Sequence, residues 1–554
     1  MDLVLVGLPG SGKSAVGRRV AAHHEAAFVD LDASIEQAAG RPIPEIFAAQ
    51  GEEAFRGLES IAIEALGPAD DAPVLRRVIA TGGGAILAPR NRWRLYRGRH
   101  AVWLQASVGV LARRVRFGTK RPLLTGPDPR AGLRELAERR ARFYAAARRI
   151  DGEGPRAGVV ARVDQVVAAP PPMGTALLHA ETPVGELHIG SADGPDALVE
   201  RLGRSGSGRT AIVAEPEVWR LHGARFAAAL RDAGMETLTF LMPRGEAAKT
   251  IAAVEALLRD FAGARLERGE SVVALGGGAL GDAAGFAAAV WLRGVPLVHV
   301  PTTLLAQMDS AIGGKTGVDL PEGKNLVGAF HPPSATIVDV SLLETLPERE
   351  RRAALGEAVK MALLGDEALF ELLEREGAAI ARGDPVAFES GALAELVERC
   401  AWRKVEIVIA DPSETRLDGR IVLNLGHTIG HAVEAASGYR LLHGEAVAHG
   451  LRGALAVGGN LGVTPPELAR RALDLLDELD LAQDPSAADA RLVRSLIAAD
   501  KKRSSGRVRW VLAGAEGPVI RVDVPELAIE AGIAAALGAA DRVPRVAAGW
   551  RGDR

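Results

Sequence analysis

Short apolar runs alternate with segments of helical spacing along most of this chain, which predicts α/β domains built on parallel sheets. The first run, residues 3–6, is followed by a glycine-rich turn and by a helix expected from about Ser14. Further along, the clearest strand predictions are residues 211–214, 271–275, 297–300 and 336–339. From about Glu348 to about residue 500, Ala, Leu, Glu and Arg recur with helical spacing. We therefore expect two α/β parts followed by a mostly helical part.

Three consecutive prolines separate the first α/β part from the second. The run AAPPPMG at residues 168–174 can continue neither a helix nor a central strand, so it predicts a stiff linker. The last residues, DRVPRVAAGWRGDR, are basic and we expect them to be disordered. The predicted boundaries are residues 1–165 for the first domain, 166–176 for the linker, 177–345 for the second α/β half, 346–540 for the helical half and 541–554 for the tail.

The composition is typical of a soluble globular protein and excludes several classes. The net charge is only -3, so a broad nucleic-acid-binding surface is not expected. The single cysteine, Cys400, excludes a disulfide framework, and we expect it to be buried. The N-terminus has no signal-peptide pattern, and no apolar run approaches the roughly 20 residues that a membrane span needs. We expect a cytoplasmic protein that binds neither nucleic acid nor membranes.

A phosphate-binding loop stands at the N-terminus. The segment GLPGSGKS at residues 7–14 fits G-x-x-x-x-G-K-[ST] and lies between a predicted strand and a predicted helix, as the motif requires. Glycines in such a loop let backbone N–H groups surround phosphates at a helix N-terminus. Lys13 would reach the β- and γ-phosphates, and Ser14 would bind Mg²⁺. The loop predicts ATP or GTP binding and leaves the acceptor open.

Residues beyond the loop narrow the acceptor. The segment FVDLDASIE carries Asp30 and Asp32 at alternate positions after a predicted strand. Further along are ATGGG at 80–84 and three arginine-containing segments, FR at 55–56, KRPLL at 120–124 and RRARFY at 139–144. Phosphoryl transfer needs cations around the developing charge. Together these segments resemble shikimate kinase over residues 1–165. A gluconate-type kinase shares the phosphate loop, but two arginines for a carboxylate, with GGG and RPLL, favour shikimate.

The resemblance implies an NMP-kinase-like fold around a parallel sheet, and it assigns roles. Asp32 would bind the substrate hydroxyls and act as the base, and Arg56 and Arg140 would hold the carboxylate. Arg121 would be the lid arginine that closes over ATP. Arg121 and Lys13 would both act in catalysis. The residues expected around ATP and Mg²⁺ are Gly10, Ser11, Gly12, Lys13, Ser14, Asp30, Arg114 and Arg121. The residues expected around shikimate are Asp32, Arg56, Gly82, Gly83, Gly84 and Arg140.

The second half of the chain contains a different set of motifs. GGGALGD at residues 276–282 follows a predicted strand, and its glycines suit close approach of a diphosphate, although it is not G-x-G-x-x-G. Alone it is a weak signal. It is accompanied by GGKTGVD at 313–319, GKNLVGAF at 323–330, GEAVKMALL at 356–364, NLGHTIGHAVE at 424–434, LHGEAV at 442–447 and DKK at 500–502.

These motifs resemble 3-dehydroquinate synthase across roughly residues 176–530. The resemblance implies a Rossmann-like NAD domain followed by an α-helical metal domain, a Zn²⁺ (or Co²⁺) ion, and a homodimer formed through this half. The implied metal ligands are Glu357, His427 and His443. The implied NAD contacts are Glu246, Lys249, Gly278, Ala279, Leu280, Gly281, Asp282, Thr302, Thr303, Lys315 and Lys324. Of the implied substrate contacts, Lys404 and Arg420 would bind a carboxylate. Those implied around a phosphate are Lys315, Asn325, Asn424, His431 and one of Lys501 and Lys502, with Arg293 from a partner subunit.

The substrate implied is 3-deoxy-arabino-heptulosonate 7-phosphate (DAHP), which carries a carboxylate and a phosphate. NAD⁺ would transiently oxidise its C5 alcohol, phosphate would leave, and the ring would open and reclose as 3-dehydroquinate. The residues expected to act in this chemistry are Asp309, Lys315, Lys360 and His431. The loop at residues 410–420 is longer than the family's D-E-x-E-x-G-x-R, so residues 412–418 receive no role.

Four of the chain's 12 histidines lie between Asn424 and Gly450. His427 and His431 would lie one turn apart on one helix face, but the pair lacks the Glu that makes H-E-x-x-H a hydrolase motif. The resemblance divides the pair: His427 would bind the metal, and His431 would face the substrate phosphate.

Two alternatives stay open. The second half could be another sugar-phosphate cyclase or a metal- and NAD-dependent polyol dehydrogenase of the same superfamily. Alternatively, one half could be a non-catalytic scaffold for the other, although no expected catalytic residue is missing. The two reactions are not consecutive in the shikimate pathway, so channelling between them is not implied.

Overall fold

The computed structural model describes residues 1–69, 72–115, 128–169, 175–416, 419–481, 485, 488–503 and 508–538. They form two compact units. The first comprises Met1–Gly206, Arg225–Gly234 and Ile337–Ser341, and the second comprises Ser207–Ala224, Met235–Thr336 and the part from Leu342 onward. Among the described residues, no helix combines the length and the apolar character that crossing a membrane demands.

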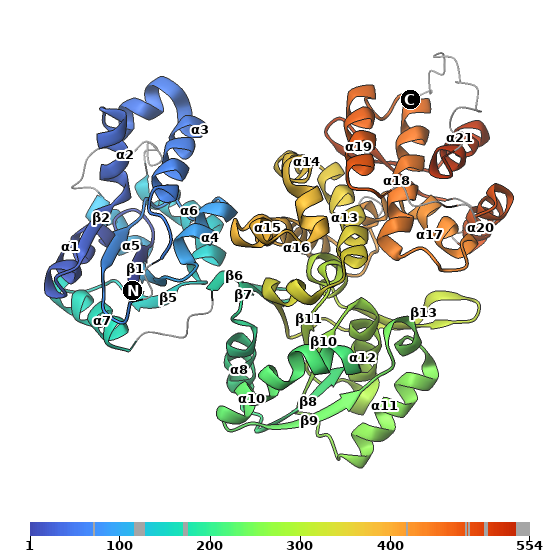
Figure 1. The fold of residues 1–554 in the computed structure, drawn as a ribbon, viewed down its shortest axis with the longest axis horizontal. Helices are drawn as coiled ribbons and strands as arrows, with labels where there is room; N and C mark the ends of the chain where they lie inside the picture. Colours follow the sequence, from blue (N-terminus) through green and yellow to red (C-terminus); the bar gives the residue numbers. More distant parts are fainter. Residues whose placement is uncertain are drawn as a thin grey trace. The chain divides into compact units, whose positions relative to one another are not determined.

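The N-terminal region is a parallel sheet surrounded by helices (Figure 1). Its strands are β1 (Asp2–Val6), β2 (Ala27–Asp30), β3 (Arg77–Ala80), β4 (His100–Gln105) and β5 (Arg148–Asp151), in the order β2-β3-β1-β4-β5. Its helices are α1 (Lys13–His23), α2 (Leu31–Ala39), α3 (Ile43–Glu64), α4 (Pro89–Tyr96), α5 (Val108–Val115), α6 (Pro129–Tyr144) and α7 (Arg156–Ala168). All five residues of β1 are buried, as expected for a central parallel strand covered on both faces. The helix expected from about Ser14 begins at Lys13.

The stretch between the flanking helix and strand is shorter than the predicted linker, residues 166–176. Helix α7 continues to Ala168, and strand β6 begins at Thr175. A proline disfavours helical geometry only in the residue immediately before it. The helix can therefore continue almost up to the prolines instead of ending at residue 165. Residues 170–174 and the predicted tail, 541–554, lie outside the described residues.

The second α/β part contains a seven-stranded sheet in the order β6-β7-β14-β11-β10-β8-β9. Its strands are β6 (Thr175–Thr182), β7 (Gly185–Ser191), β8 (Arg209–Ala214), β9 (Glu236–Leu241), β10 (Ser271–Gly276), β11 (Leu297–Pro301) and β14 (Ala335–Asp339). Strands β6 and β7 pair antiparallel, whereas β8 to β11 and β14 pair in parallel. All four strand predictions are confirmed, within β8, β10, β11 and β14.

Helices and a second hairpin surround this sheet. The helices are α8 (Gly194–Ser205), α9 (Pro216–Val218), α10 (Ala224–Asp232), α11 (Ile251–Gly263) and α12 (Gly278–Val290). The hairpin strands are β12 (Lys315–Leu320) and β13 (Gly323–Phe330). The short 3₁₀ and π segments are η2 (Trp219–Gly223), η3 (Gly245–Ala248), η4 (Trp291–Arg293), η5 (Ala306–Ser310) and η6 (Val340–Thr345). Helix α12 packs against β10, β11 and β12, and its apolar residues lie in the core of the sheet.

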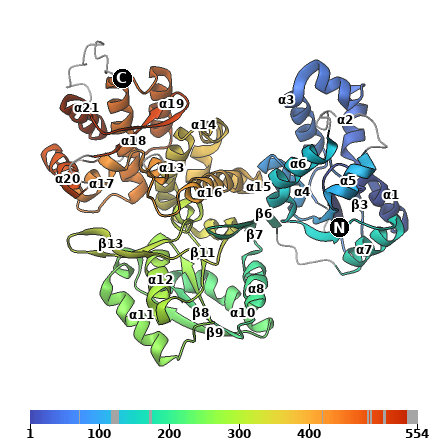
Figure 2. The ribbon, with the colours of Figure 1, turned by 180° about the vertical axis from the view of Figure 1, so that it is seen from behind.

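The helical half is confirmed from Glu348 onward. Its elements are α13 (Glu348–Leu363), α14 (Glu367–Arg382), α15 (Pro385–Glu389), α16 (Ala392–Ala410), η7 (Arg420–Asn424), α17 (His427–Ala436), α18 (His443–Asn460), α19 (Pro466–Glu478), α20 (Ala490–Arg503) and α21 (Glu526–Ala536). Helices α17, α18, α20 and α21 gather into one group, seen from both sides in Figures 1 and 2. The hairpin β15 (Trp510–Gly514) and β16 (Gly517–Arg521), which the helical pattern does not predict, buries Trp510 and Leu512 in their core.

Candidate active sites

The phosphate loop follows the central strand β1 and leads into α1. Gly12 precedes the helix with a φ of 97°, a left-handed conformation that glycine adopts without strain. Lys13 is buried, and its Nζ donates hydrogen bonds to the backbone oxygens of Gly7 at 2.7 Å and Leu8 at 3.3 Å. Ser14 lies in the first turn of α1. The ammonium and the helix N-terminus make an electropositive end suited to nucleotide phosphates.

The two carboxylates near the end of β2 occupy different positions. Asp30 precedes α2, and its Oδ1 accepts a hydrogen bond from Ala33 N at 3.5 Å, so it caps that helix. Asp32 lies in the first turn of α2, and a Cβ on Gly82 would lie 2.8 Å from its Oδ1. Strands β2, β3 and β1 are parallel neighbours, so their carboxyl ends bring Asp30, Gly82 and the phosphate loop to one edge.

Two arginines lie against the glycine triplet that follows β3. Arg140 is buried, and its Nη1 donates to the backbone oxygen of Gly83 at 2.6 Å. A Cβ on Gly84 would lie 2.5 Å from Arg56 Nη2, so any side chain at this position would displace that guanidinium. Both arginines predicted to bind a carboxylate therefore lie on one glycine-lined surface.

Glu59 belongs to the same site, although the sequence did not single it out. Its side chain is buried, and its Oε2 lies 2.7 Å from Arg56 Nη1. A Cβ on Gly82 would lie 2.8 Å from Glu59 Oε1 and from Asp32 Oδ1 alike, so the two carboxyl groups flank this glycine. Burial raises the pKa of Glu59, although the Arg56 guanidinium opposes the shift. The only sequence signal was the i, i+3 spacing between Arg56 and Glu59 on α3.

The predicted ATP-side arginines are only partly described. Arg114 lies on α5, where its Nη2 donates to the backbone oxygen of Gly152 at 3.0 Å and its Nη1 to that of Gly10 at 3.5 Å. It therefore lies beside the phosphate loop. Arg121, the predicted lid arginine, lies outside the described residues.

The glycine run of the second half joins β10 to α12. The predicted NAD residues Gly278, Ala279, Leu280, Gly281 and Asp282 form the start of α12. Thr302, just after β11, donates its N–H to the backbone oxygen of Gly276 at 3.0 Å, and Thr303 Oγ1 accepts from Ala306 N at 3.3 Å. A helix N-terminus and the ends of two parallel strands thus meet at one edge, the usual place for a dinucleotide diphosphate.

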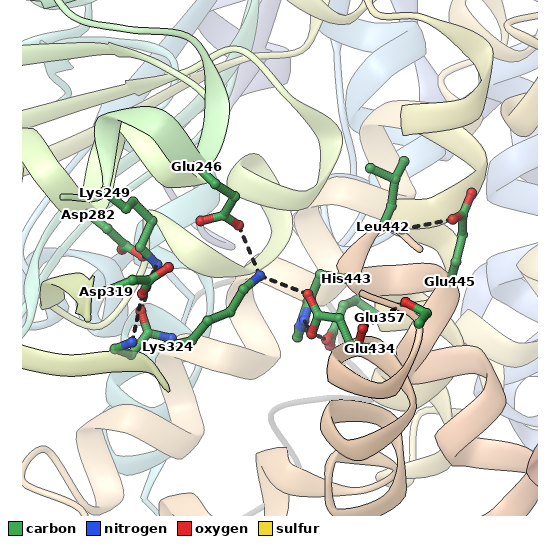
Figure 3. A network of polar contacts seen from close by, with 12 residues as sticks. Glu246, Lys249, Asp282, Asp319, Lys324, Glu357, Glu434, Leu442, His443 and Glu445 are labelled. Atoms are coloured by element: carbon green, nitrogen blue, oxygen red, sulfur yellow. Dashed lines mark hydrogen bonds and ion pairs between the residues drawn. The ribbon is translucent and has the colours of Figure 1, made fainter. Parts of the chain in front are cut away.

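Lys249 lies at the centre of a polar network beside this edge (Figure 3). It is buried, and its Nζ lies 2.9 Å from Asp282 Oδ2 and donates to Asn325 Oδ1 at 2.6 Å. Burial raises the pKa of Asp282, although the Lys249 ammonium lowers it. Asn325, which the resemblance assigned to the substrate phosphate, here faces the predicted NAD residues.

Three helices bring together a carboxylate and two imidazoles. Glu357 on α13 places its Oε1 3.4 Å from the Nε2 of His427, the first residue of α17, and 3.2 Å from the Nε2 of His443, the first residue of α18. Helices α13 and α18 approach closely at Gly444, where a Cβ would lie 2.6 Å from the carbonyl carbon of Ala353. The side chains predicted to bind a metal are therefore in mutual contact.

The environment of Glu357 fits a divalent cation. The carboxylate is buried and ion-paired with Lys360, yet neither of its oxygens accepts a hydrogen bond of good geometry from the described residues. Burial raises its pKa, but the Lys360 ammonium and the imidazoles of His427 and His443 outweigh burial and hold the pKa well below its usual range. One carboxylate and two imidazoles are a donor set typical of catalytic Zn²⁺, and they also suit Co²⁺.

A third imidazole belongs to the same cluster. Ring nitrogens of His427, His431 and His443 all lie within 4.8 Å of one another. Burial lowers the pKa of His427 well below its usual range, whereas the His431 side chain is exposed. Burial also lowers the pKa of His443, but the carboxylates of Glu357 and Glu434 beside it raise it to about 9. The sequence prediction that separates His431 from the metal therefore needs an experiment.

Cations predicted to bind the substrate carboxylate lie close by. Lys404 on α16 is buried, ion-paired with Asp309, and its Nζ donates to the Asp309 backbone oxygen at 2.8 Å. Burial raises the pKa of Asp309, but the ammonium groups of Lys404 and Lys360 lower it overall. Arg420 is buried, and its Nη1 donates to the backbone oxygen of Gly313 at 3.1 Å.

Two acidic residues of this site escaped the sequence prediction. Glu414, in the loop that received no role, forms an ion pair with Lys315. Glu434, at the end of the histidine motif, has its Oε2 3.4 Å from His443 Nδ1 and its Oε1 2.8 Å from Lys324 Nζ. The i, i+3 spacing from His431 was the only local signal for Glu434.

The remaining predicted contacts are less informative. Arg293 is exposed at the end of the segment after α12, and Asn424 ends η7, three residues before His427. The side chains of Lys501 and Lys502 lie outside what the structure describes.

Family comparisons match both parts of the chain. The family model of shikimate kinase matches residues 9–167. The models of the 3-dehydroquinate synthase N-terminal and C-terminal domains match residues 239–353 and 354–503. A 3-dehydroquinate synthase of Symbiobacterium thermophilum is 44% identical over 314 residues, which are 56% of this chain and 86% of that protein. The chain belongs to the 3-dehydroquinate synthase family and carries a shikimate kinase domain before it. It is therefore a bifunctional enzyme, a kinase followed by a lyase.

Solved structures similar to the synthase part include related cyclases. A 2-epi-5-epi-valiolone synthase of Streptomyces hygroscopicus subsp. jinggangensis, solved with NAD⁺ and Zn²⁺, is 32% identical with a TM-score of 0.56; the match covers 60% of this chain and 91% of that one. A 2-deoxy-scyllo-inosose synthase, solved with carbaglucose-6-phosphate, NAD⁺ and Co²⁺, is 25% identical with a TM-score of 0.57, covering 63% and 96%. The Rossmann-like and helical halves predicted from the sequence are those of the synthase fold.

Proposed function

We propose that the kinase domain transfers the γ-phosphoryl group of ATP to shikimate, giving shikimate 3-phosphate, and that the synthase part converts DAHP to 3-dehydroquinate and phosphate with NAD⁺ and Zn²⁺ or Co²⁺. The observation that carries the second assignment is the buried Glu357 carboxylate between His427 and His443, with Lys360, Asp309 and Lys404 beside it. We further propose a cytoplasmic homodimer formed through the synthase half.

In the kinase domain, position and charge account for the chemistry. Lys13 binds the transferring phosphoryl group, and Ser14 and Asp30 hold Mg²⁺, directly or through water. Asp32 accepts the proton of the attacking hydroxyl. Arg56 and Arg140 bind the shikimate carboxylate, and their placement against the glycine triplet supports this role. Such a site works by orienting the acceptor and stabilising developing negative charge.

In the synthase part, bound NAD⁺ would accept and return a hydride, and a metal ion on Glu357, His427 and His443 would acidify the hydroxyl being oxidised. Lys404 and Arg420 bind the substrate carboxylate. Asp309 and Lys360 orient the ring hydroxyls. His431 accepts or donates a proton near the leaving phosphate.

DAHP is favoured over other sugar phosphates by the buried cations. A substrate without a carboxylate has no need of both Lys404 and Arg420, two buried cations that suit a site where an anionic group has to be held. The 44% identity to a 3-dehydroquinate synthase points the same way, against 32% and 25% for the two cyclases.

Phosphate release tests the assignment. Purified full-length enzyme is incubated with DAHP and NAD⁺, with and without a chelator, and inorganic phosphate and 3-dehydroquinate are measured. We expect equal amounts of both products and their loss with chelator. Net reduction of NAD⁺ without phosphate release would instead indicate a polyol dehydrogenase. Preference for a sugar phosphate without a carboxylate would indicate another cyclase.

A further inference from the structure

Glu434 lies between two charged partners on separate elements. Its Oε2 lies 3.4 Å from His443 Nδ1 on α18, and its Oε1 lies 2.8 Å from Lys324 Nζ on β13. Only 4% of its side chain is exposed. A buried carboxylate with two cationic or donor partners is oriented by both of them, so a change at one partner reaches the other.

The two metal-binding imidazoles are oriented in different ways. His427 Nδ1 lies 3.2 Å from the backbone oxygen of Leu425, a partner whose position the start of α17 sets. His443 Nδ1 instead faces Glu434, a side chain. A ligand imidazole usually donates its other N–H to such a group, which selects the tautomer and frees Nε2 for the metal. His443 is thus the ligand whose orientation depends on another ionisable residue.

Lys324 connects that residue to the NAD side. Its Nζ lies 3.1 Å from Glu246 Oε1 as well as 2.8 Å from Glu434 Oε1, and it lies 4.9 Å from the Tyr439 ring centroid. Figure 3 shows the ammonium between the two carboxylates. The chain of contacts runs from Glu246 through Lys324 and Glu434 to His443, whose Nε2 faces Glu357.

We propose that Glu434 is a positioning residue that holds His443 in its metal-binding tautomer, and that its ion pair with Lys324 couples metal binding to NAD⁺ binding. The proposal rests on the proposed function, because it takes Glu246 and Lys324 as NAD⁺ contacts, as the resemblance to 3-dehydroquinate synthase implies. If NAD⁺ binds to Glu246 or to Lys324, it changes the strength of the ion pair between Lys324 and Glu434. By thermodynamic linkage, NAD⁺ then alters metal affinity, and the metal alters NAD⁺ affinity by the same factor.

Cobalt binding to the full-length protein tests both parts without catalysis. The visible absorption of bound Co²⁺ reports its ligand set, and competition with a chelator gives the dissociation constant, each with and without saturating NAD⁺. We expect E434A to bind Co²⁺ about 10- to 100-fold more weakly, the usual effect of losing such a partner. E434Q can still accept the His443 N–H, so it should recover most of that affinity.

The coupling is read from the effect of NAD⁺. In the unmodified protein we expect NAD⁺ to change the Co²⁺ dissociation constant by about fivefold or more, the lower end of typical coupling. In K324M and in E434Q, NAD⁺ should no longer change the Co²⁺ dissociation constant. K324M removes the positive charge of the ion pair, and E434Q removes its negative charge. The matched control is R349M, which breaks the Arg349–Glu445 pair at 2.8 Å in the first turn of α18 and touches neither Glu434 nor Lys324. It should behave as the unmodified protein.

Each outcome decides one claim. Co²⁺ affinity of E434A within twofold of R349M would overturn the positioning role, and NAD⁺ dependence that persists in K324M would overturn the coupling. If circular dichroism shows that E434A is unfolded, the NAD⁺ dependence of Co²⁺ binding in K324M still tests the coupling. The Co²⁺ spectrum of E434Q then tests the positioning role. Failure of the unmodified, cobalt-binding protein to convert DAHP would refute the proposed reaction while leaving these binding results interpretable.

Discussion

Replacing Gly84 with alanine should impair shikimate binding without unfolding the kinase domain. The added Cβ would lie 2.5 Å from Arg56 Nη2 and 2.7 Å from Cζ, whereas ordinary contacts begin near 3.4 Å. Since Arg56 Nη1 would lie closer still, the guanidinium must move by about 1 Å. It is the end of a flexible side chain, so the fold accommodates the change. The cost falls on the ion pair with Glu59 and on any carboxylate that Arg56 binds.

The magnitude follows from the interaction that is lost. A hydrogen bond to a charged group contributes about 1.5–3 kcal/mol. Since about 1.4 kcal/mol corresponds to a factor of ten, kcat/KM for shikimate should fall about 10- to 150-fold. The KM for ATP should change little, because Lys13 and the phosphate loop are untouched. Release of 3-dehydroquinate from DAHP should be unaffected.

The assay is ADP release at varied shikimate, with circular dichroism as the check on folding. Gly57→Ala is the matched control: it adjoins Arg56 on α3, and its Cβ would meet no atom within 4 Å. A folded Gly84→Ala enzyme whose kcat/KM stays within twofold of the control would refute the carboxylate-binding role of Arg56.

Three further predictions concern separate parts of the chain. Lys13→Met should lower kinase activity about 10²- to 10³-fold, as loss of one charge-stabilising donor does. Phosphate release from DAHP should stay within twofold of that of the unmodified enzyme, and loss of both activities would argue against independent sites. His427→Ala should lose bound metal and synthase activity, whereas His431→Ala should keep the metal, measured by elemental analysis, and lose rate; metal loss in both variants would make His431 a ligand. Burial lowers the pKa of His188, but Asp193, 2.8 Å away, raises it above the usual 6.5. The pair therefore stabilises the fold below about pH 6.5, and this contribution is lost as the pH rises through the folded-state pKa of His188. The melting temperature of His188→Gln should accordingly fall less between pH 6 and pH 9 than that of the unmodified protein, and parallel melting curves would contradict the raised pKa.

Buried parallel strands were predictable because their sequence is continuous and apolar. Residues 271–275 form all but the last residue of β10, each of whose residues is buried. The hairpin of β12 and β13 lacks that signal, since every position of β13 is exposed or half-buried and the strand contains two glycines and a lysine. The β15–β16 hairpin was missed for a different reason. Its strands of five residues follow a long helical stretch, and a short apolar run cannot be told from a buried helix by periodicity alone.

Site residues were predictable where the chemistry resides in a local motif, and not where it depends on a distant partner. The phosphate loop, the glycine triplet and the histidine motif are each contiguous. By contrast, Lys324 and Glu434 are 110 positions apart, and Lys315 and Glu414 are 99 apart. An ion pair between such residues leaves no periodicity in the sequence. These groups meet because the β12–β13 hairpin lies against α17 and against the loop that follows α16.

The histidine cluster shows what geometry adds to spacing. The i, i+4 pair predicts that His427 and His431 share a helix face, but three imidazoles lie within 4.8 Å, so proximity alone cannot select the ligands. The second ring nitrogen distinguishes them. That of His427 faces a backbone oxygen and that of His443 faces Glu434, whereas in the described part of the chain no group accepts a hydrogen bond from His431. Ligand imidazoles need such an anchor, so the anchors favour His427 and His443 and leave His431 free to turn toward a substrate phosphate.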